Sequence, residues 1–331
     1  MPLISTTDYP RVPRYFRNAH VQTIVPSLFR PLAPAAYERE RLTLSDGDFV
    51  DLDWLDRGAR RLVLLSHGLE GDTHRRYMVG MARAFYARGW DVLAWNCRSC
   101  SGEMNRAARL YHHGETEDLG EVIAHALRTR PYDTLLPVGF SMGGNMTLKY
   151  MAVTGAAIPD VIRTAVAFSA PVDLVASAEH LEVGFNRVYK DRFMRALGKK
   201  MQLKARQYPE LIDAADLKRV RVWYDFDKYF SAPLFGLDSP EALYAVASAH
   251  HFIAGIDRPV LLVNAQNDPI LTPSCSPVEL CRTHPHLHLQ TPAQGGHVGF
   301  WQPGMDRAWS ETRALRWAAA HAGFPLSSPA L

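Results

Sequence analysis

The chain has 331 residues, a length that suits one large α/β domain with an insertion or two ordinary domains. Hydrophobic residues make up 47% of it and charged residues 21%, which excludes a disordered chain and indicates a globular protein with a full core. The net charge of +3 is small and Lys and Arg form no long run, which excludes binding to nucleic acid through a strongly basic surface.

The number of cysteines and the length of the apolar segments indicate the cellular compartment of the protein. Four cysteines are too few for a disulfide scaffold, and Cys97-x-x-Cys100 has no second pair at zinc spacing, because Cys275 and Cys281 are spaced differently. We therefore expect reduced thiols, no metal and no cofactor. No signal peptide is evident, and no window approaches the roughly 18 consecutive apolar residues of a membrane span. We expect a soluble, cytoplasmic protein.

The beginning of the chain predicts little regular structure. Residues 1–40 are rich in Pro and Arg with scattered apolar side chains, so we expect an irregular lead-in that packs against the core. A hairpin is predicted next. Residues 41–44 and 49–55 alternate apolar and polar side chains around Ser45-Asp46-Gly47-Asp48, a turn of the Asp-Gly type.

Strands and helices then alternate. Each predicted strand is a continuous apolar run, as expected of strands covered on both faces, so the pattern predicts a mostly parallel sheet with helices on both sides. Functional residues of such a sheet belong at the carboxyl ends of its strands. We expect strands at 61–66, 91–95, 135–140, 164–169, 259–264 and 287–290, and helices at 74–88, 115–130, 145–153 and 306–320.

Residues 172–257 interrupt this alternation. We interpret them as a helical lid over the carboxyl edge of the sheet, inserted between two parts of one core, residues 1–171 and 258–331. Within the lid, residues 181–208 carry eight Lys and Arg among apolar residues at helical spacing. This spacing predicts a helix pair with a solvated basic face; the alternative is a surface that attracts anionic lipid or an acidic substrate.

The most informative motif is Gly139-Phe140-Ser141-Met142-Gly143, which follows an apolar strand and precedes good helix formers up to Val153. In this context a Gly-x-Ser-x-Gly pattern predicts a serine on a sharp strand-to-helix turn. Space there is tight, so the residues two before and two after must lack a Cβ. The hydroxyl would stand at a helix N-terminus, where the dipole favours developing negative charge. We expect Ser141 to be a nucleophile.

A nucleophilic serine needs a base, and the base needs a carboxylate that holds its tautomer. Asp268 follows the strand at 259–264, and His297 lies in a glycine-rich loop after the strand at 287–290. The order Ser141, Asp268, His297 is that of α/β-hydrolases, and it predicts these three residues as a catalytic triad.

Other carboxylates and histidines are placed less well for these roles. Four aspartates lie in or beside the lid rather than after a late strand: Asp225, Asp227, Asp238 and Asp257. The three histidines at 284, 286 and 288 have no carboxylate at matching spacing, so we expect no metal there. The adjacent histidines at 112 and 113 do not converge easily on one ion.

Acyl transfer to serine also needs two backbone N–H donors for the oxyanion. Met142, next to the nucleophile, supplies one. Leu69 supplies the other, in the loop His67-Gly68-Leu69 after the strand at 61–66. Gly68 permits close approach of backbone to substrate, and we expect His67 to be a structural hydrogen-bonding residue rather than a second base.

Motifs along nearly the whole chain resemble the YheT-like branch of the α/β-hydrolases, which is related to eukaryotic abhydrolase-domain proteins that act on lipid esters. The resemblance implies Ser141 as nucleophile, Asp268 and His297 as its partners, and a carboxylic-ester substrate. Ser99 stands where the family usually has glycine. The matching stretches are Asn18 to Thr23, His67 to Gly71, Asn96 to Arg98, Cys100 to Glu103, Tyr111-His112, Thr116 to Leu119, Gly139 to Asn145, Ser231 to Leu234 and Asp268-Pro269.

We therefore expect an α/β-hydrolase fold and a serine hydrolase that cleaves small-molecule acyl esters through an acyl-enzyme, with peripheral lipid contact possible at the lid. Acyl transfer and thioester hydrolysis are the enzyme alternatives, because both would use the same triad. A binding protein on an inactive hydrolase fold is the alternative outside catalysis. Such a protein is expected to have lost a triad residue, and none is lost here.

Overall fold

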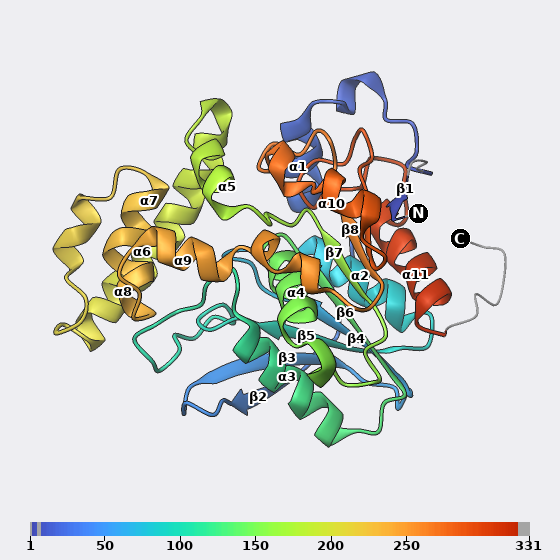
Figure 1. The fold of residues 1–331 in the computed structure, drawn as a ribbon, viewed down its shortest axis with the longest axis horizontal. Coiled ribbons are helices and arrows are strands. Elements are labelled where there is room, and N and C mark those ends of the chain that lie inside the picture. Colours follow the sequence, from blue (N-terminus) through green and yellow to red (C-terminus); the bar gives the residue numbers. More distant parts are fainter. Residues whose placement is uncertain (1, 5–7, 324–331) are drawn as a thin grey trace.

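A computed structural model of the protein describes residues 2–4 and 8–323, and its centre is one twisted sheet (Figure 1). The described strands run in the order β1-β9-β8-β7-β6-β4-β5-β3-β2. β2 is antiparallel to β3 and β3 to β5, and the other neighbouring pairs are parallel. The strands are β1 Leu3–Ile4, β2 Glu38–Thr43, β3 Phe49–Leu55, β4 Arg61–Ser66, β5 Asp91–Asn96, β6 Thr134–Phe140, β7 Ala165–Phe168, β8 Val260–Val263 and β9 Leu287–Gln290.

Helices cover both faces of the sheet, as predicted. On one face α2 and α11 pack Met78, Phe85 and Leu315 against it, and on the other face α3 and α4 contribute Val122 and Met146. The helices are α1 Ala19–Phe29, α2 Arg76–Tyr86, α3 Thr116–Thr129, α4 Met142–Val153, α5 Leu174–His180, α6 Arg187–Gln207, α7 Trp223–Phe226, α8 Ala232–Leu234, α9 Pro240–Ala247, α10 Val278–Thr283 and α11 Trp309–His321.

The central strands explain the continuous apolar runs of the sequence. In β4 the four residues Leu62 to Leu65 are fully buried, and so is every residue of β8. Full burial of one such side chain contributes about 1.5–3 kcal/mol relative to exposure. This burial fixes the middle of the sheet, whose carboxyl ends carry the candidate site.

The expectation of an irregular lead-in is wrong for residues 19–29, which form helix α1. The Asn18 side chain caps this helix, accepting hydrogen bonds from the His20 and Val21 amides at 2.9 and 3.2 Å. The buried residues of α1 include the polar Gln22 and Thr23. The sequence of this helix therefore lacks the regular spacing of apolar residues by which a helix is predicted.

The prediction of a helix pair at 181–208 is also wrong, because α6 runs unbroken over 21 residues. Its basic residues do not all face solvent either. Lys204 is fully buried and donates to the carbonyl oxygens of Asn105 and Ala107. Lys200 forms an ion pair of 2.7 Å with Glu70 in the core. Both lysines therefore tie α6 to the loops that carry Asn105 and Glu70.

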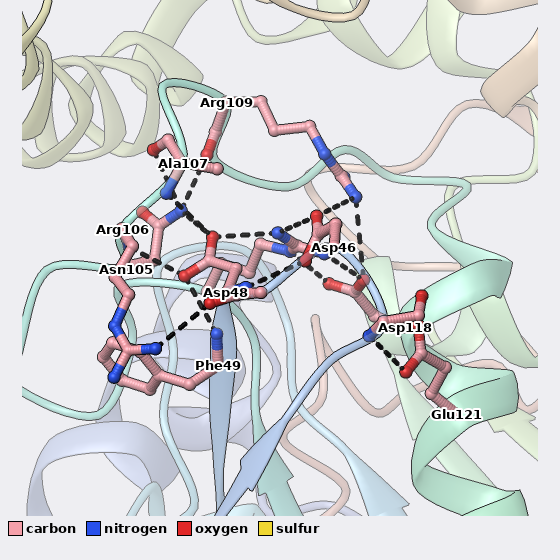
Figure 2. A network of polar contacts seen from close by, with 12 residues as sticks. Asp46, Asp48, Phe49, Asn105, Arg106, Ala107, Arg109, Asp118 and Glu121 are labelled. Carbon is pink, nitrogen blue, oxygen red and sulfur yellow. Dashed lines mark hydrogen bonds and ion pairs between the residues drawn. The ribbon is translucent and has the colours of Figure 1, made fainter.

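The long loop between β5 and α3 is held by the polar network in Figure 2. The buried Arg98 guanidinium donates to Asp46, Asp48 and Asp118, so it joins the hairpin turn to α3. Asn105, farther along the loop, donates to Asp48 at 2.6 Å. Breaking a buried ion pair from one side costs about 3–5 kcal/mol, so this loop is firmly anchored.

Ser99 lies in the same loop and adopts the left-handed conformation that glycine prefers, with φ of 61°. Its hydroxyl accepts from the Asn105 amide at 2.9 Å and donates to the Asn105 side chain at 2.5 Å. A non-glycine residue in this conformation is strained. These two hydrogen bonds hold the serine in this turn.

Candidate active site

Ser141 lies at the end of β6, where the chain turns sharply into α4. Its backbone has φ of 52° and ψ of −118°, a strained conformation for a residue with a side chain. A Cβ on Gly139 would lie 2.1 Å from the Gly143 carbonyl oxygen, and one on Gly143 would lie 2.3 Å from the Ser66 carbonyl oxygen. Both glycines are therefore sterically required, for the reason that the sequence motif predicted.

The structure brings Ser141, His297 and Asp268 into one hydrogen-bonded line. His297 Nε2 lies 2.9 Å from Ser141 Oγ, and His297 Nδ1 lies 3.0 and 2.9 Å from the two Asp268 oxygens. Because a carboxylate only accepts, Nδ1 carries the proton and Nε2 is left to accept from the serine hydroxyl. Asp268 Oδ1 also accepts from the amides of Ile270 and Leu271 at 2.9 and 3.2 Å, which fixes the carboxylate.

Side chains hold three consecutive amides of the His297 loop. The Gly295 amide donates to Gln22 Oε1 at 2.7 Å, the Gly296 amide to Asn267 at 3.1 Å, and the His297 amide to Thr23 Oγ1 at 2.9 Å. Two of these three acceptors come from α1. The helix missed by sequence analysis therefore fixes the backbone of the candidate base.

Gln22 joins the loop of the acid to the loop of the base. Besides Gly295, its Oε1 accepts from Asn267 at 3.1 Å, and its Nε2 donates to the Phe16 carbonyl oxygen and to Gln294 at 2.8 and 2.6 Å. The side chain is 1% exposed, so water cannot replace these partners. The stretch Asn18 to Thr23, one of the family motifs, contains Gln22. Because the stretch is polar, the sequence gave no structural reason to expect that Gln22 joins the two loops.

His67 shapes the loop that follows β4. Its Nε2 lies 3.1 Å from the Cys97 amide and therefore accepts, which leaves Nδ1 to donate to the Gly68 carbonyl oxygen at 2.7 Å. Burial lowers its pKa to about 4, so the ring is neutral at physiological pH. These contacts fit the structural role expected for His67. The Gly68 amide in turn donates to Tyr77 at 3.0 Å.

Two backbone amides remain available beside Ser141. None of the hydrogen bonds found within residues 2–4 and 8–323 engages the N–H of Leu69 or of Met142. Gly68 packs directly on Ser141, since a Cβ on it would lie 3.0 Å from Ser141 Cβ. The loop that carries Leu69 therefore lies directly against the serine turn.

An apolar cavity opens beside Ser141 and His297, and the space between its walls is about 1020 Å³ when the adjoining open solvent is included. Core loops contribute Leu69, Tyr111 and Ile270 to its wall. The remaining wall comes mainly from α5 to α9, which gather at one side of the molecule (left in Figure 1). Mostly apolar side chains therefore form the wall of the cavity beside the serine.

Other histidines considered as a base or a metal ligand are buried or hydrogen-bonded elsewhere. Burial lowers the pKa of His112 to about 3 and that of His113 to about 4. His284 Nδ1 accepts from the amides of His286 and Leu287, and His284 Nε2 lies 3.2 Å from the Ala254 carbonyl oxygen. Within the described part of the chain, no group of three or more His, Cys, Asp or Glu side chains is arranged to hold a metal ion.

One protein-family model matches more than half of the chain. The family model for the alpha/beta hydrolase fold matches residues 61–303, which include the loop at His67, the serine turn, Asp268 and His297. The chain therefore belongs to the α/β-hydrolase fold family. The predicted fold class and the predicted resemblance to the YheT-like branch are confirmed.

Individual relatives carry the names of ester-cleaving enzymes. The chain is 35% identical to YheT, a protein of Escherichia coli strain K12 named as a candidate esterase, with 93% of this chain and 92% of YheT aligned. It is 26% identical to human phospholipase ABHD3 over 90% of this chain and 75% of that protein. A solved esterase of Pyrococcus furiosus shares the fold with a TM-score of 0.58 and 15% identity, covering 87% of this chain and 93% of the esterase.

No helix among the described residues is long and apolar enough to cross a membrane.

Proposed function

We propose that the protein is a serine hydrolase that cleaves carboxylic esters through an acyl-enzyme, with Ser141 as nucleophile, His297 as base and Asp268 as its carboxylate partner. The observation that carries this proposal is the 2.9 Å contact between Ser141 Oγ and His297 Nε2 at the wall of an apolar cavity. The names of the relatives support an ester as the substrate.

In the proposed first half-reaction, His297 Nε2 takes the hydroxyl proton while Ser141 Oγ attacks the acyl carbon. The carbonyl oxygen becomes an oxyanion that accepts from the Leu69 and Met142 amides, at the N-terminus of α4. The intermediate collapses, and the alcohol leaves with the proton from His297. In the second half-reaction, water gives its proton to His297 and releases the acid by the reverse steps.

Asp268 has two tasks in this scheme. Its carboxylate holds the tautomer in which His297 Nδ1 is protonated, and it stabilises the imidazolium that forms during attack. Hydrogen bonds from Ile270 and Leu271 support it, since they orient the carboxylate without neutralising it. The carboxylate itself keeps its charge throughout.

We propose that residues 172–257 act as a lid whose helices line the acyl site. Leu174, Phe193, Leu197, Phe230 and Leu243 all lie on this segment and line the cavity. An apolar acyl chain would replace water against them, and each buried methylene group contributes about 0.8 kcal/mol. Medium-length acyl chains therefore suit the cavity better than acetyl groups.

Acyl transfer and thioester hydrolysis remain the alternatives, because they share the acyl-enzyme and differ in the acceptor or the leaving group. A cytoplasmic location also stays a prediction, which the four free thiols support, since disulfides are rare in that compartment. Peripheral contact with lipid stays a prediction too. The exposed side chains of Val183, Phe185 and Val188, which lie near Arg187, support it.

A series of p-nitrophenyl esters tests the proposed substrate class. We expect kcat/KM to rise about 3- to 4-fold per added methylene group until the chain fills the cavity, and then to fall. A burst of p-nitrophenol equal to the enzyme concentration would reveal the acyl-enzyme. Added alcohols would compete with water if the protein is a transferase. A preference for acetyl over every longer ester would contradict the proposal.

Gln22 is the positioning residue whose loss should be most informative. We expect Gln22→Ala to lower kcat by about 10- to 100-fold with little change in KM, because a displacement of about 1 Å in the base has effects of this size. The pH profile of kcat/KM should change as well, since the contact between His297 and Asp268 loosens.

The matched control is Gln302→Ala. Gln302 is also buried and donates to the Arg11 carbonyl oxygen, but it does not contact the amides of the His297 loop. We expect this control to lower the melting temperature and leave kcat and the pH profile unchanged. Equal losses of kcat in both variants would mean that Gln22 acts only through stability.

A further inference from the structure

One carboxyl group in the cavity has no part in the proposed reaction. Asp227 begins a turn of π-helix, Asp227–Ser231, between α7 and α8, and it is 6% exposed. It lines the same cavity as Ser141 and His297. Single turns of π-helix are rare and occur frequently at functional sites.

The hydrogen bond of Asp227 with Tyr244 favours its charged form. The Tyr244 hydroxyl donates to Asp227 Oδ2 at 2.7 Å. A carboxylate has about four acceptor positions. Acceptor positions therefore remain for a group in the cavity.

Within the described residues, no Lys or Arg side chain forms an ion pair with Asp227. No Lys or Arg lines the cavity within that part of the chain. The lining His112 and His113 are neutral at physiological pH, because burial lowers the pKa of both. A buried charge is costly unless it is paired, so the missing partner is an informative feature.

The surroundings of Asp227 suit a positive ligand. Trp223, Phe226 and Phe230 lie on the same segment and line the cavity with it, and aromatic faces attract cations. A purely structural group would need only to accept from Tyr244, for which a neutral amide oxygen would also serve. Burial raises the pKa of Asp227 to about 6, which still leaves it mainly ionised above pH 7.

We propose that Asp227 and the aromatic residues beside it form a subsite for an ammonium group carried by the ester substrate. This inference rests on the proposed esterase function and deepens it. Ser141 would attack the acyl carbon while the cationic end of the substrate lies against the carboxylate in the same cavity. Esters with such a group are then preferred over neutral esters of equal size.

Matched esters test the subsite. One set of p-nitrophenyl esters has acyl chains ending in a trimethylammonium group, a second ends in the neutral tert-butyl group of the same shape, and a third ends in a hydroxyl. We expect the wild-type protein to favour trimethylammonium over tert-butyl by about 10-fold in kcat/KM at the best chain length. An equal or higher rate for tert-butyl at every length, or a preference for hydroxyl alone, would overturn the inference.

Variants then assign the preference to one residue. Asp227→Asn keeps the size and an acceptor oxygen, and we expect it to abolish the preference for trimethylammonium while the tert-butyl ester is still hydrolysed. The control Asp238→Asn removes an exposed carboxylate from the same lid, and we expect the preference to persist. A preference that survives Asp227→Asn would overturn the assignment.

A failure of the proposed esterase function would give a different result from a failure of the subsite. If the folded wild-type protein hydrolyses none of the three sets, the esterase proposal fails. The subsite is then still tested by calorimetric titration with octyltrimethylammonium and with the neutral 3,3-dimethylbutyl ether of similar length. Tighter binding of the ammonium compound supports the subsite, and equal binding contradicts it. If Asp227→Asn does not fold, the comparison of esters in the wild-type protein decides alone.

Discussion

Replacing Ser141 with alanine should lower kcat for p-nitrophenyl esters by about 10⁵- to 10⁶-fold, because the acyl-enzyme can no longer form. The fold should survive. The strained turn at Ser141 depends on the absence of a side chain at Gly139 and at Gly143. An alanine at position 141 changes neither glycine and adds no atoms. The melting temperature is therefore expected to stay within a few degrees of the wild-type value.

Two measurements accompany this variant. Steady-state kinetics give kcat, and thermal unfolding shows whether the loss is chemical. The control Ser310→Ala removes the hydroxyl of another buried serine, on α11, and should leave kcat unchanged. If Ser141→Ala kept a tenth of the wild-type kcat, a different nucleophile would carry the reaction and the central proposal would be wrong.

Replacing Asp268 with asparagine should have the next largest effect, a fall in kcat of about 10⁴-fold. The asparagine amide group can donate to His297, so the ring would bind in the tautomer with Nδ1 unprotonated and Nε2 protonated. That ring cannot accept the Ser141 proton. The local backbone should persist, because the asparagine carbonyl oxygen can still accept from Ile270.

The pH profile separates this effect from unfolding. We expect Asp268→Asn to recover some activity at high pH, where Ser141 loses its proton without help from His297. The control Asp257→Asn removes an exposed carboxylate before β8, and we expect a wild-type profile. An unchanged profile with near-normal kcat in Asp268→Asn would assign the carboxylate role to another residue.

The parts of the fold predictable from sequence are those governed by burial on both faces or by backbone sterics. β4 and β8 are continuous apolar runs because each lies in the middle of the sheet. Gly139 and Gly143 could be interpreted from sequence because their lack of a side chain has a local cause. These two kinds of signal were enough to place Ser141 at the end of a central strand.

Features held by tertiary polar contacts could not be predicted. Helix α1 buries Gln22. Its partners in the two candidate catalytic loops are 245 or more residues away along the chain, so no local pattern reveals these contacts. Lys204 belonged to an apparently solvated basic face, and its burial depends on carbonyl groups of a distant loop.

Asp227 illustrates the same limit within the candidate site. In the sequence it was one of four aspartates in or beside the lid, and its position there argued against a role as the triad acid. The structure buries it in the cavity with Tyr244 as a partner, 17 residues away. Its distinctive property is the lack of a compensating cation, which depends on the whole cavity wall and on no local motif.

A fluorophosphonate probe tests the central claim most directly, because it forms a covalent bond with a serine only where a base and oxyanion donors activate it. The account predicts that the folded wild-type protein is labelled at Ser141, identified by peptide mapping, and that His297→Ala is labelled far more slowly. Absence of labelling in folded protein, or labelling of a different serine at the same rate in Ser141→Ala, would contradict it.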